Sequence, residues 1–146
     1  MKEILIELFE RDLEKLKSEI LLYKKEATIW AVDNEVKNSA GNLCLHIAGN
    51  LRAFIGGGLA NIDYVRDRDF EFNGKGVSRD ELLSRLDLAK KVTVEGLQTL
   101  DETKLESDFP ILIWKEKRGM VFTLLHLHSH LTYHLGQVNY HRRLLS

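Results

Sequence analysis

Hydrophobic positions recur at helical spacing in four separate segments of the chain. Spacings of three and four residues place side chains on one face of an α-helix, so each segment is predicted to bury one stripe and expose the rest. The predicted helices cover residues 2–24, 39–60, 79–101 and 121–145. Apolar and polar residues alternate, as in a strand, only near residues 111–121. The expected fold class is therefore all-α, a four-helix bundle formed by one domain spanning residues 1–146.

Signals at the helix ends support this division of the chain. Ser39 is a candidate N-cap of the second helix, and Ser78 with Glu81 forms a capping box at the start of the third. The run Gly56-Gly57-Gly58 either weakens the end of the second helix or lets another backbone approach closely.

Two long connections join the helices. Residues 62–77 are predicted to be a loop. At about 3.3 Å per residue this loop could cover roughly 50 Å, more than the roughly 33 Å of a 22-residue helix. It can therefore run the length of the bundle and leave the second and third helices parallel. Residues 102–120 are expected to pack an extended stretch on the bundle.

Charge and cysteine content exclude several classes of function. Lys and Arg number 21 against 22 Asp and Glu, without a basic block, so nucleic acid is not an expected partner. No apolar run approaches the roughly 18 residues of a membrane span, and the first residues lack a signal-peptide core. Cys44 is the only cysteine and is expected to be a small buried apolar residue. A reducing, cytoplasmic compartment is therefore expected.

Histidines are the main candidates for chemistry. His126, His130 and His134 are spaced by four residues, so they share one helix face, which the neighbouring apolar residues predict to be buried. His46 lies in the middle of the second helix. Unpaired imidazoles on a buried face are costly to desolvate, and a pair at this spacing can hold one metal ion. Together these residues predict a metal site inside the bundle.

The roles of the individual histidines stay open at this level. A lone buried histidine such as His46 is more often a hydrogen-bonded core residue than a ligand. His126 could be a fourth ligand or could orient a ligand from outside. His128 points away from His130, so it is expected to face solvent or pack against another element. His141, near the chain end, could simply favour the negative end of the helix dipole.

The ligand types indicate the chemistry of such a site. Imidazole suits zinc, nickel, iron, cobalt and copper. Three histidines without a carboxylate leave a dication uncompensated, so the site should attract an anion and lower the pKa of a bound water or thiol. Three protein ligands leave a position open, as in catalytic zinc sites. No glutamate lies between His130 and His134, which argues against an H-E-x-x-H peptidase, and there is no phosphate-binding glycine loop or G-x-S-x-G elbow.

Two motifs resemble those of the DinB-like (YfiT-like) superfamily. They are Leu43-Cys-Leu-His46-Ile-Ala-Gly49-Asn50 and the run His126-Leu-His-Ser-His130-Leu-Thr-Tyr-His134-Leu-Gly136-Gln137-Val138. The resemblance extends over nearly the whole chain in order and spacing. It implies a four-helix bundle in up-down-down-up order, with His46, His130 and His134 as metal ligands. It also implies a homodimer, and the apolar residues Ile4, Ile6 and Leu22 beside the main stripe of the first helix favour one.

The superfamily includes metal-dependent thiol transferases that use bacillithiol, mycothiol or glutathione, a thiol-dependent isomerase, and many members without an established activity. The resemblance thus implies a divalent metal, zinc, nickel or iron, that binds a low-molecular-weight thiol as thiolate for attack on a small electrophile. Tyr133 and Asn50 are candidates to assist this reaction, and no general base can be identified. Two alternatives remain: a non-catalytic metal-binding stress or interaction protein, and a metal-dependent hydrolase.

Overall fold

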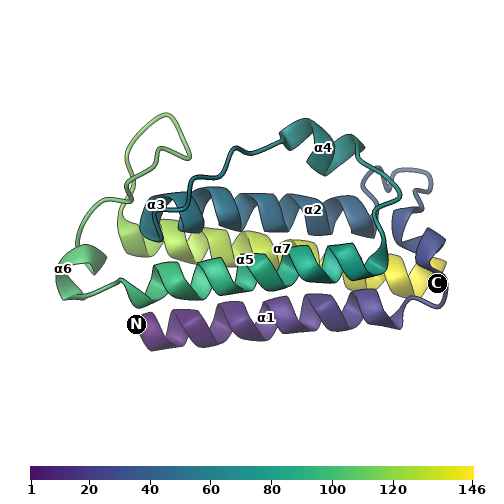
Figure 1. The fold of residues 1–146 in the computed structure, drawn as a ribbon, viewed down its shortest axis with the longest axis horizontal. Helices are drawn as coiled ribbons and strands as arrows, with labels where there is room; N and C mark the ends of the chain where they lie inside the picture. Colours follow the sequence, from purple (N-terminus) through teal and green to yellow (C-terminus); the bar gives the residue numbers. More distant parts are fainter.

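Four long helices dominate the computed structural model, which describes residues 1–146 (Figure 1). They are α1 (Lys2–Leu22), α2 (Ala40–Leu51), α5 (Arg79–Gln98) and α7 (Met120–Leu145). A π-helical turn, η2 (Arg52–Gly56), and α3 (Gly57–Leu59) continue α2 along the same axis. The four predicted segments therefore match the structure, and Ser39 and Ser78 cap α2 and α5 as predicted. The capping box is only half formed, because the Glu81 carboxylate pairs with Arg85 and not with the Ser78 amide. The only β pairings are isolated bridges, so the all-α fold class is confirmed.

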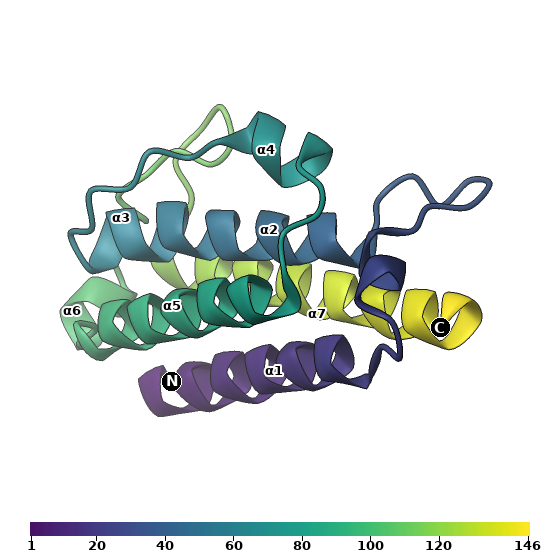
Figure 2. The same ribbon diagram turned by 45° about the vertical axis from the view of Figure 1, so that its right-hand side comes forward.

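The helices follow the predicted up-down-down-up order. In Figures 1 and 2, α2 runs back along α1, α5 runs parallel to α2, and α7 returns in the direction of α1. Both α1 and α2 pack on α5 and on α7, so α1 and α2 occupy diagonal corners of the bundle. This order needs a crossover that returns along the whole bundle between α3 and α5.

The core follows the apolar stripe of α1, whose members recur at helical spacing and are fully buried: Leu5, Phe9, Leu13, Leu16 and Ile20. By contrast, every residue of α2 is buried. This helix therefore buries a polar stripe too, with Asn42, His46 and Asn50 spaced by four residues. Buried polar groups need partners, and the crossover that covers α2 supplies some of them.

That crossover contains a helix, so the prediction that residues 62–77 are only a loop was wrong. Helix α4 (Arg68–Asn73) begins after Asp67, whose carboxylate accepts a hydrogen bond from the Phe70 amide. Asn42 of α2 donates to the carbonyls of Glu71 and Gly74, at 3.0 and 2.8 Å, and so fixes α4 on α2. Six residues are too few for a stable isolated helix, so packing on α2 decides its formation.

The glycine run permits close packing, but against a side chain of α5 and not against another backbone. A Cβ atom at Gly56 would lie 2.6 Å from Val92 Cγ1, so only glycine lets η2 pack this closely on α5. The remaining connections hold the short helices η1 (Glu26–Trp30) and α6 (Glu102–Leu105). After α6 the chain forms a single bridge, Asp108 to Gly119, and no strand near 111–121. No helix of the fold combines the length and the apolarity that crossing a bilayer requires.

Candidate metal centre

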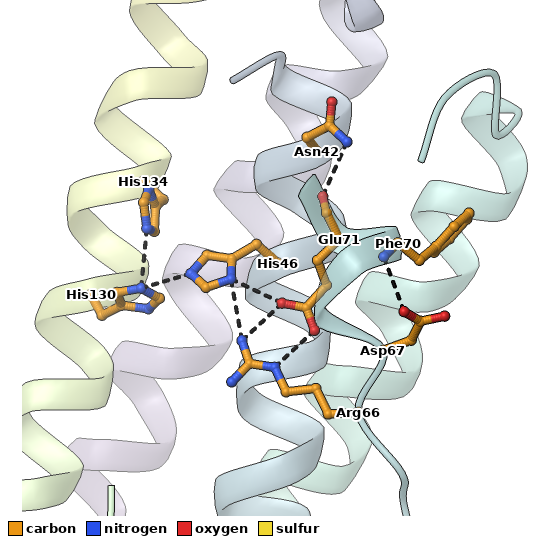
Figure 3. Close-up of polar contacts among 8 residues, drawn as sticks. All are labelled: Asn42, His46, Arg66, Asp67, Phe70, Glu71, His130 and His134. Atoms are coloured by element: carbon orange, nitrogen blue, oxygen red, sulfur yellow. Dashed lines mark hydrogen bonds and ion pairs between the residues drawn. The ribbon is translucent and has the colours of Figure 1, made fainter. Parts of the chain in front are cut away.

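Three histidines from two helices converge between α2 and α7 (Figure 3). The Nε2 atom of His130 lies 3.0 Å from His46 Nε2 and 3.1 Å from His134 Nε2. One ligand atom from each of the three side chains lies within 4.8 Å of the others. The structure therefore brings together the three residues that the sequence motifs singled out as ligands.

The spacing of these nitrogens fits one bound ion. A tetrahedral ion with metal–nitrogen bonds of about 2.0–2.1 Å holds its ligand nitrogens about 3.3 Å apart. The two Nε2–Nε2 distances, 3.0 and 3.1 Å, are close to that value. Small rotations of the histidine side chains would therefore place all three nitrogens around one cation.

Hydrogen bonds at the opposite ring atoms fix the tautomers of two of the histidines. His46 Nδ1 lies 3.0 Å from Glu71 Oε1, and His134 Nδ1 lies 2.7 Å from Gln137 Oε1. Arg66 Nη2 also lies 3.2 Å from His46 Nδ1, but the carboxylate oxygen is closer and can only accept. These contacts therefore favour a proton on both Nδ1 atoms, with both Nε2 atoms presenting a lone pair toward His130. A single proton on His130 Nε2 could bridge only one of them. A cation satisfies all three lone pairs, so the arrangement suits a metal better than a hydrogen-bonded core.

Glu71, which no sequence pattern predicted, is the carboxylate that contacts the histidine cluster, through His46. It is 3% exposed, and Arg66 clamps it by donating from Nε to Oε2 and from Nη2 to Oε1, both at 2.8 Å. Burial opposes ionisation of Glu71, but hydrogen bonds from His46 and Arg66 outweigh it and hold the pKa of the carboxyl below its usual range. A Cβ atom at Gly49 would collide with Glu71 Oε2, so the glycine of α2 makes room for the carboxylate.

Two of the imidazoles, those of His130 and His134, are held in the neutral form at pH 7. Burial, reinforced by the neighbouring His134 and His46 rings, lowers the pKa of His130 to about 4. Burial also lowers the pKa of His134, against the opposing hydrogen bond to Gln137. Neutral imidazole is the form that binds metals, so these lone pairs are available to a cation over the physiological range.

His126 does not join the cluster. Its side chain is exposed and stands against the Trp114 ring, with ring centroids 4.7 Å apart. The expectation that its helix face is buried was wrong at this residue. Each step of four residues turns by about 40°, so His126 is rotated about 80° from His134 and lies about 12 Å away along the axis. That rotation takes it out of the groove between α2 and α7.

Two other histidines pack against neighbouring elements. His128 turns toward α1, with Nε2 3.0 Å from Asp12 Oδ2, although the angle is not that of a hydrogen bond, and its ring meets the Phe9 ring edge-on. This confirms the packed alternative for His128. His141 is buried, accepts from the Tyr23 hydroxyl at Nδ1 (2.6 Å) and donates from Nε2 to a loop carbonyl, that of Ala31 (2.8 Å). It ties the C-terminal part of α7 to the chain that follows α1.

The other sequence candidates lie outside the cluster itself. Tyr133 is 65% exposed, and its ring contacts the edge of His134 at a centroid distance of 5.4 Å. Asn50 is buried on α2 one turn after His46. Cys44 is buried as expected, and burial raises the pKa of its thiol, so it supplies no reactive thiolate. Sequence reasoning missed Glu71 and Arg66; the one available signal was the helix-capping pattern at Asp67, four residues before Glu71.

Comparisons with known proteins agree with this fold. A conserved protein from Enterococcus faecalis of known crystal structure superposes with a TM-score of 0.79 at 16% sequence identity, covering 99% of this chain and 96% of the other. At that identity the likeness shows the fold alone. No curated protein matches the sequence. Residues 4–146 match the model of the family described as protein of unknown function (DUF1572), which is nearly the whole chain. The chain therefore belongs to the DUF1572 family.

Proposed function

We propose that this protein is a metal-dependent enzyme of the DinB-like superfamily that transfers a low-molecular-weight thiol to small electrophiles. The observation that carries the metal site is the convergence of His46, His130 and His134 at Nε2, with two of the Nδ1 atoms held by acceptors. The choice of thiol transfer is supported by the resemblance of the two histidine motifs to that superfamily.

The charges around the site favour an anionic ligand. Arg66 and Glu71 form a bidentate pair and neutralise one another. Imidazole ligands bring no negative charge, so a bound dication would keep nearly its full charge, and a thiolate or hydroxide would compensate it. The proposed metal, zinc, nickel or iron, supplies Lewis acidity that keeps a thiol deprotonated at neutral pH.

The chain's own side chains hold the geometry for this reaction. Glu71 orients the His46 ring and Gln137 orients the His134 ring, so both Nε2 atoms stay aimed at one point. Three protein ligands leave room for a thiol sulfur. In the proposed transfer the thiol proton leaves to solvent and the sulfur forms a bond to the electrophilic carbon. In a substitution the leaving group departs with its bonding electron pair. In an addition to an activated double bond, the π electron pair moves toward the electron-withdrawing group, and the adduct takes up a proton from solvent.

A metal titration and a turnover assay test the two parts of the proposal. Protein purified without a histidine tag should carry close to one transition-metal ion per chain by elemental analysis. Metal that stays substoichiometric after adding zinc, nickel or iron would contradict the site. The loaded protein is then incubated with an electrophile and bacillithiol or glutathione. Turnover that needs the thiol supports the proposal. Turnover with water alone indicates a hydrolase, and no turnover in a broad screen indicates a non-catalytic metal-binding protein.

Alanine variants test the ligand assignment. His46→Ala, His130→Ala and His134→Ala should each lower metal affinity by orders of magnitude, because each removes one of three coordinate bonds. His126→Ala is the matched control on the same helix, and its affinity should change less than about threefold since its ring lies outside the cluster. Competition with a chelator gives the affinities, and circular dichroism verifies folding. An equal loss from His126→Ala and His130→Ala would mean that the ligand set is wrong.

A further inference from the structure

One edge of the Arg66 guanidinium has no partner, although it lies beside the histidine cluster. The other edge, Nε and Nη2, donates to the two oxygens of Glu71 at 2.8 Å each. The second N–H of Nη2 lies 3.2 Å from His46 Nδ1, which itself faces the Glu71 carboxylate. Nη1 makes no hydrogen bond within the protein and remains within reach of solvent. Arg66 therefore keeps donors available for a further acceptor.

The free Nη1 atom lies close to the point at which the three histidines converge. Only the His46 ring separates the guanidinium from that point, because Arg66 approaches its Nδ1 atom while its Nε2 atom faces His130. In Figure 3, the nitrogen of Arg66 without a dashed line points away from Glu71, toward the groove between α2 and α7. The Arg66 side chain is 12% exposed, so salt would screen its attraction for a bound anion only weakly.

The charges around Nη1 favour an anion. The pair of Arg66 and Glu71 is neutral overall, but the carboxylate lies on the edge opposite Nη1, so the pair presents its positive end to the groove. Asp67 accepts from a backbone amide of α4 and Asp69 from a side-chain amide, so neither carboxylate occupies the free edge. A guanidinium edge matches the two oxygens of a planar carboxylate. One free edge thus fits one carboxylate group.

Aromatic rings border both the guanidinium and the cluster. The Cζ atom of Arg66 lies 5.7 Å from the centre of the Phe54 ring, and the Phe72 ring lies 4.8 Å from the His46 ring between centroids. Both phenylalanines are only partly buried, so they offer apolar surface to a ligand. A small organic acid could place its carboxylate on Arg66 and its carbon skeleton against these rings.

We propose that Arg66 binds the carboxylate of the electrophilic substrate, so that the substrates are small carboxylic acids with a reactive carbon beside the carboxylate. This inference rests on the thiol-transfer function proposed above and names the class of its electrophile. Since only the His46 ring lies between Arg66 and the cluster, the carbon next to the bound carboxylate is the one within reach of a sulfur held there. With a 2-halo acid, the thiol proton leaves to solvent, the sulfur bonds to that carbon, and the halide departs with the bonding electron pair.

Chloroacetate and chloroacetamide provide a matched pair of electrophiles, since they share the reactive carbon and the leaving group and differ in charge. Each is incubated with zinc-loaded protein and glutathione or bacillithiol, and the rate enhancement over the uncatalysed reaction is measured. The enhancement should be about tenfold or more larger for chloroacetate, the value of a charge-assisted hydrogen bond. Arg66→Lys keeps a cation beside Glu71 but loses the free edge, so it should raise the KM for chloroacetate and remove this preference.

Arg68→Lys is the matched control, because Arg68 lies on the same crossover but is exposed, and it should keep the preference for chloroacetate. Equal losses for both electrophiles in Arg66→Lys would overturn the proposal, because Arg66 would then only support Glu71 or bind the thiol. A preference that survives in Arg66→Lys would also overturn it, because the carboxylate would then bind elsewhere, for example to the zinc ion.

A binding measurement separates failure of this inference from failure of thiol transfer. Phenylacetate and phenylacetamide are unreactive and differ in the same charge, and each is titrated calorimetrically into zinc-free protein. Phenylacetate should bind about tenfold or more tightly than phenylacetamide, and Arg66→Lys, but not Arg68→Lys, should remove the difference. This result without turnover on any thiol would support the carboxylate site and overturn thiol transfer. Equal binding of the acid and the amide would overturn the carboxylate site, whatever the turnover assay shows.

Discussion

At the residue scale, the side chain that most shapes the candidate site is one that lies outside the histidine cluster. Glu71 holds the proton of His46 on Nδ1 and so keeps Nε2 free for a metal. It is itself held by Arg66 and by the space that Gly49 leaves on α2. The site therefore depends on contacts between two segments, α2 and the crossover, as well as on its ligands.

Glu71→Gln is expected to lower metal affinity about 10–100-fold, the usual cost of losing a carboxylate that orients a ligating histidine. The amide keeps the shape but loses the charge and leaves Arg66 without its partner. Gly49→Ala should have a similar effect with the carboxylate still present, because its methyl group displaces Glu71. Chelator competition measures both, with exposed Glu106→Gln as the control. Affinities within threefold of wild type for both site variants would show that His46 needs no carboxylate.

Asp12 carries a second buried charge, between α1 and α7, and predicts a pH dependence of stability. Burial opposes its ionisation, but hydrogen bonds from Arg11 (2.8 Å) and Thr132 (2.9 Å) hold the pKa of the carboxyl below its usual range. A carboxyl with a lowered folded-state pKa stabilises the protein above its unfolded pKa of about 3.9, and this contribution is lost as pH falls through the folded value.

Asp12→Asn should therefore cost about 1–3 kcal/mol of unfolding free energy at pH 7, and the difference from wild type should shrink below about pH 4. Urea unfolding of both proteins at pH 7 and at pH 3 checks this, provided that circular dichroism shows a folded baseline at each pH. A difference that stays constant over this range would mean that the Asp12 charge is not what stabilises the contact.

At the element scale, glycines inside helices have opposite roles in α5 and α7. A Cβ atom at Gly96 of α5 would lie 2.8 Å from Ile55 Cγ2 and 3.2 Å from Leu59 Cβ, so this glycine permits close packing against the continuation of α2. A Cβ atom at Gly136 of α7 would have no neighbouring atom within 4 Å. Alanine favours a helix interior by about 1 kcal/mol over glycine, and overpacking costs about 1–3 kcal/mol.

Gly136→Ala is thus expected to stabilise the protein by about 0.5–1 kcal/mol, whereas Gly96→Ala should destabilise it by about 1–2 kcal/mol. Chemical unfolding of the two variants under one set of conditions compares them directly, each serving as the control for the other. Shifts of the same sign would mean that helix propensity, and not the contact between α5 and η2, decides the outcome at Gly96.

At the scale of the whole molecule, we expect a homodimer. Ile4 and Leu22 lie on one face of α1, five turns apart, and each remains 58% exposed. Ile6, also predicted to widen the apolar face, instead packs partly against the core. Light scattering at micromolar concentration should give twice the chain mass of 16.8 kDa, and Ile4→Lys should shift the mass toward the monomer. A mass near 17 kDa for the unmodified protein would rule the dimer out.

Local sequence determined the four long helices and part of the site. Their hydrophobic residues recur every three or four positions because an α-helix has 3.6 residues per turn. The spacing along the sequence therefore predicts which face of each helix is buried. The same geometry places His130 and His134 on one face of α7 without reference to any other element. That His46 faces them was inferred from its place in another apolar helix and from the resemblance of its motif, because nothing in the spacing of α2 shows what lies opposite.

Tertiary structure decided the rest. Helix α4 is too short to form alone, so packing on α2 and the hydrogen bonds from Asn42 place Glu71 against His46. Whether His126 lies in or out of the groove depends on how α7 is rotated against α2, and a 40° step is too small for periodicity to resolve. A cavity lies near the C-terminus because the loop at residues 33–38 packs beside the end of α7. Such contacts join residues far apart in the chain, and their free energy depends on packing that no local pattern encodes.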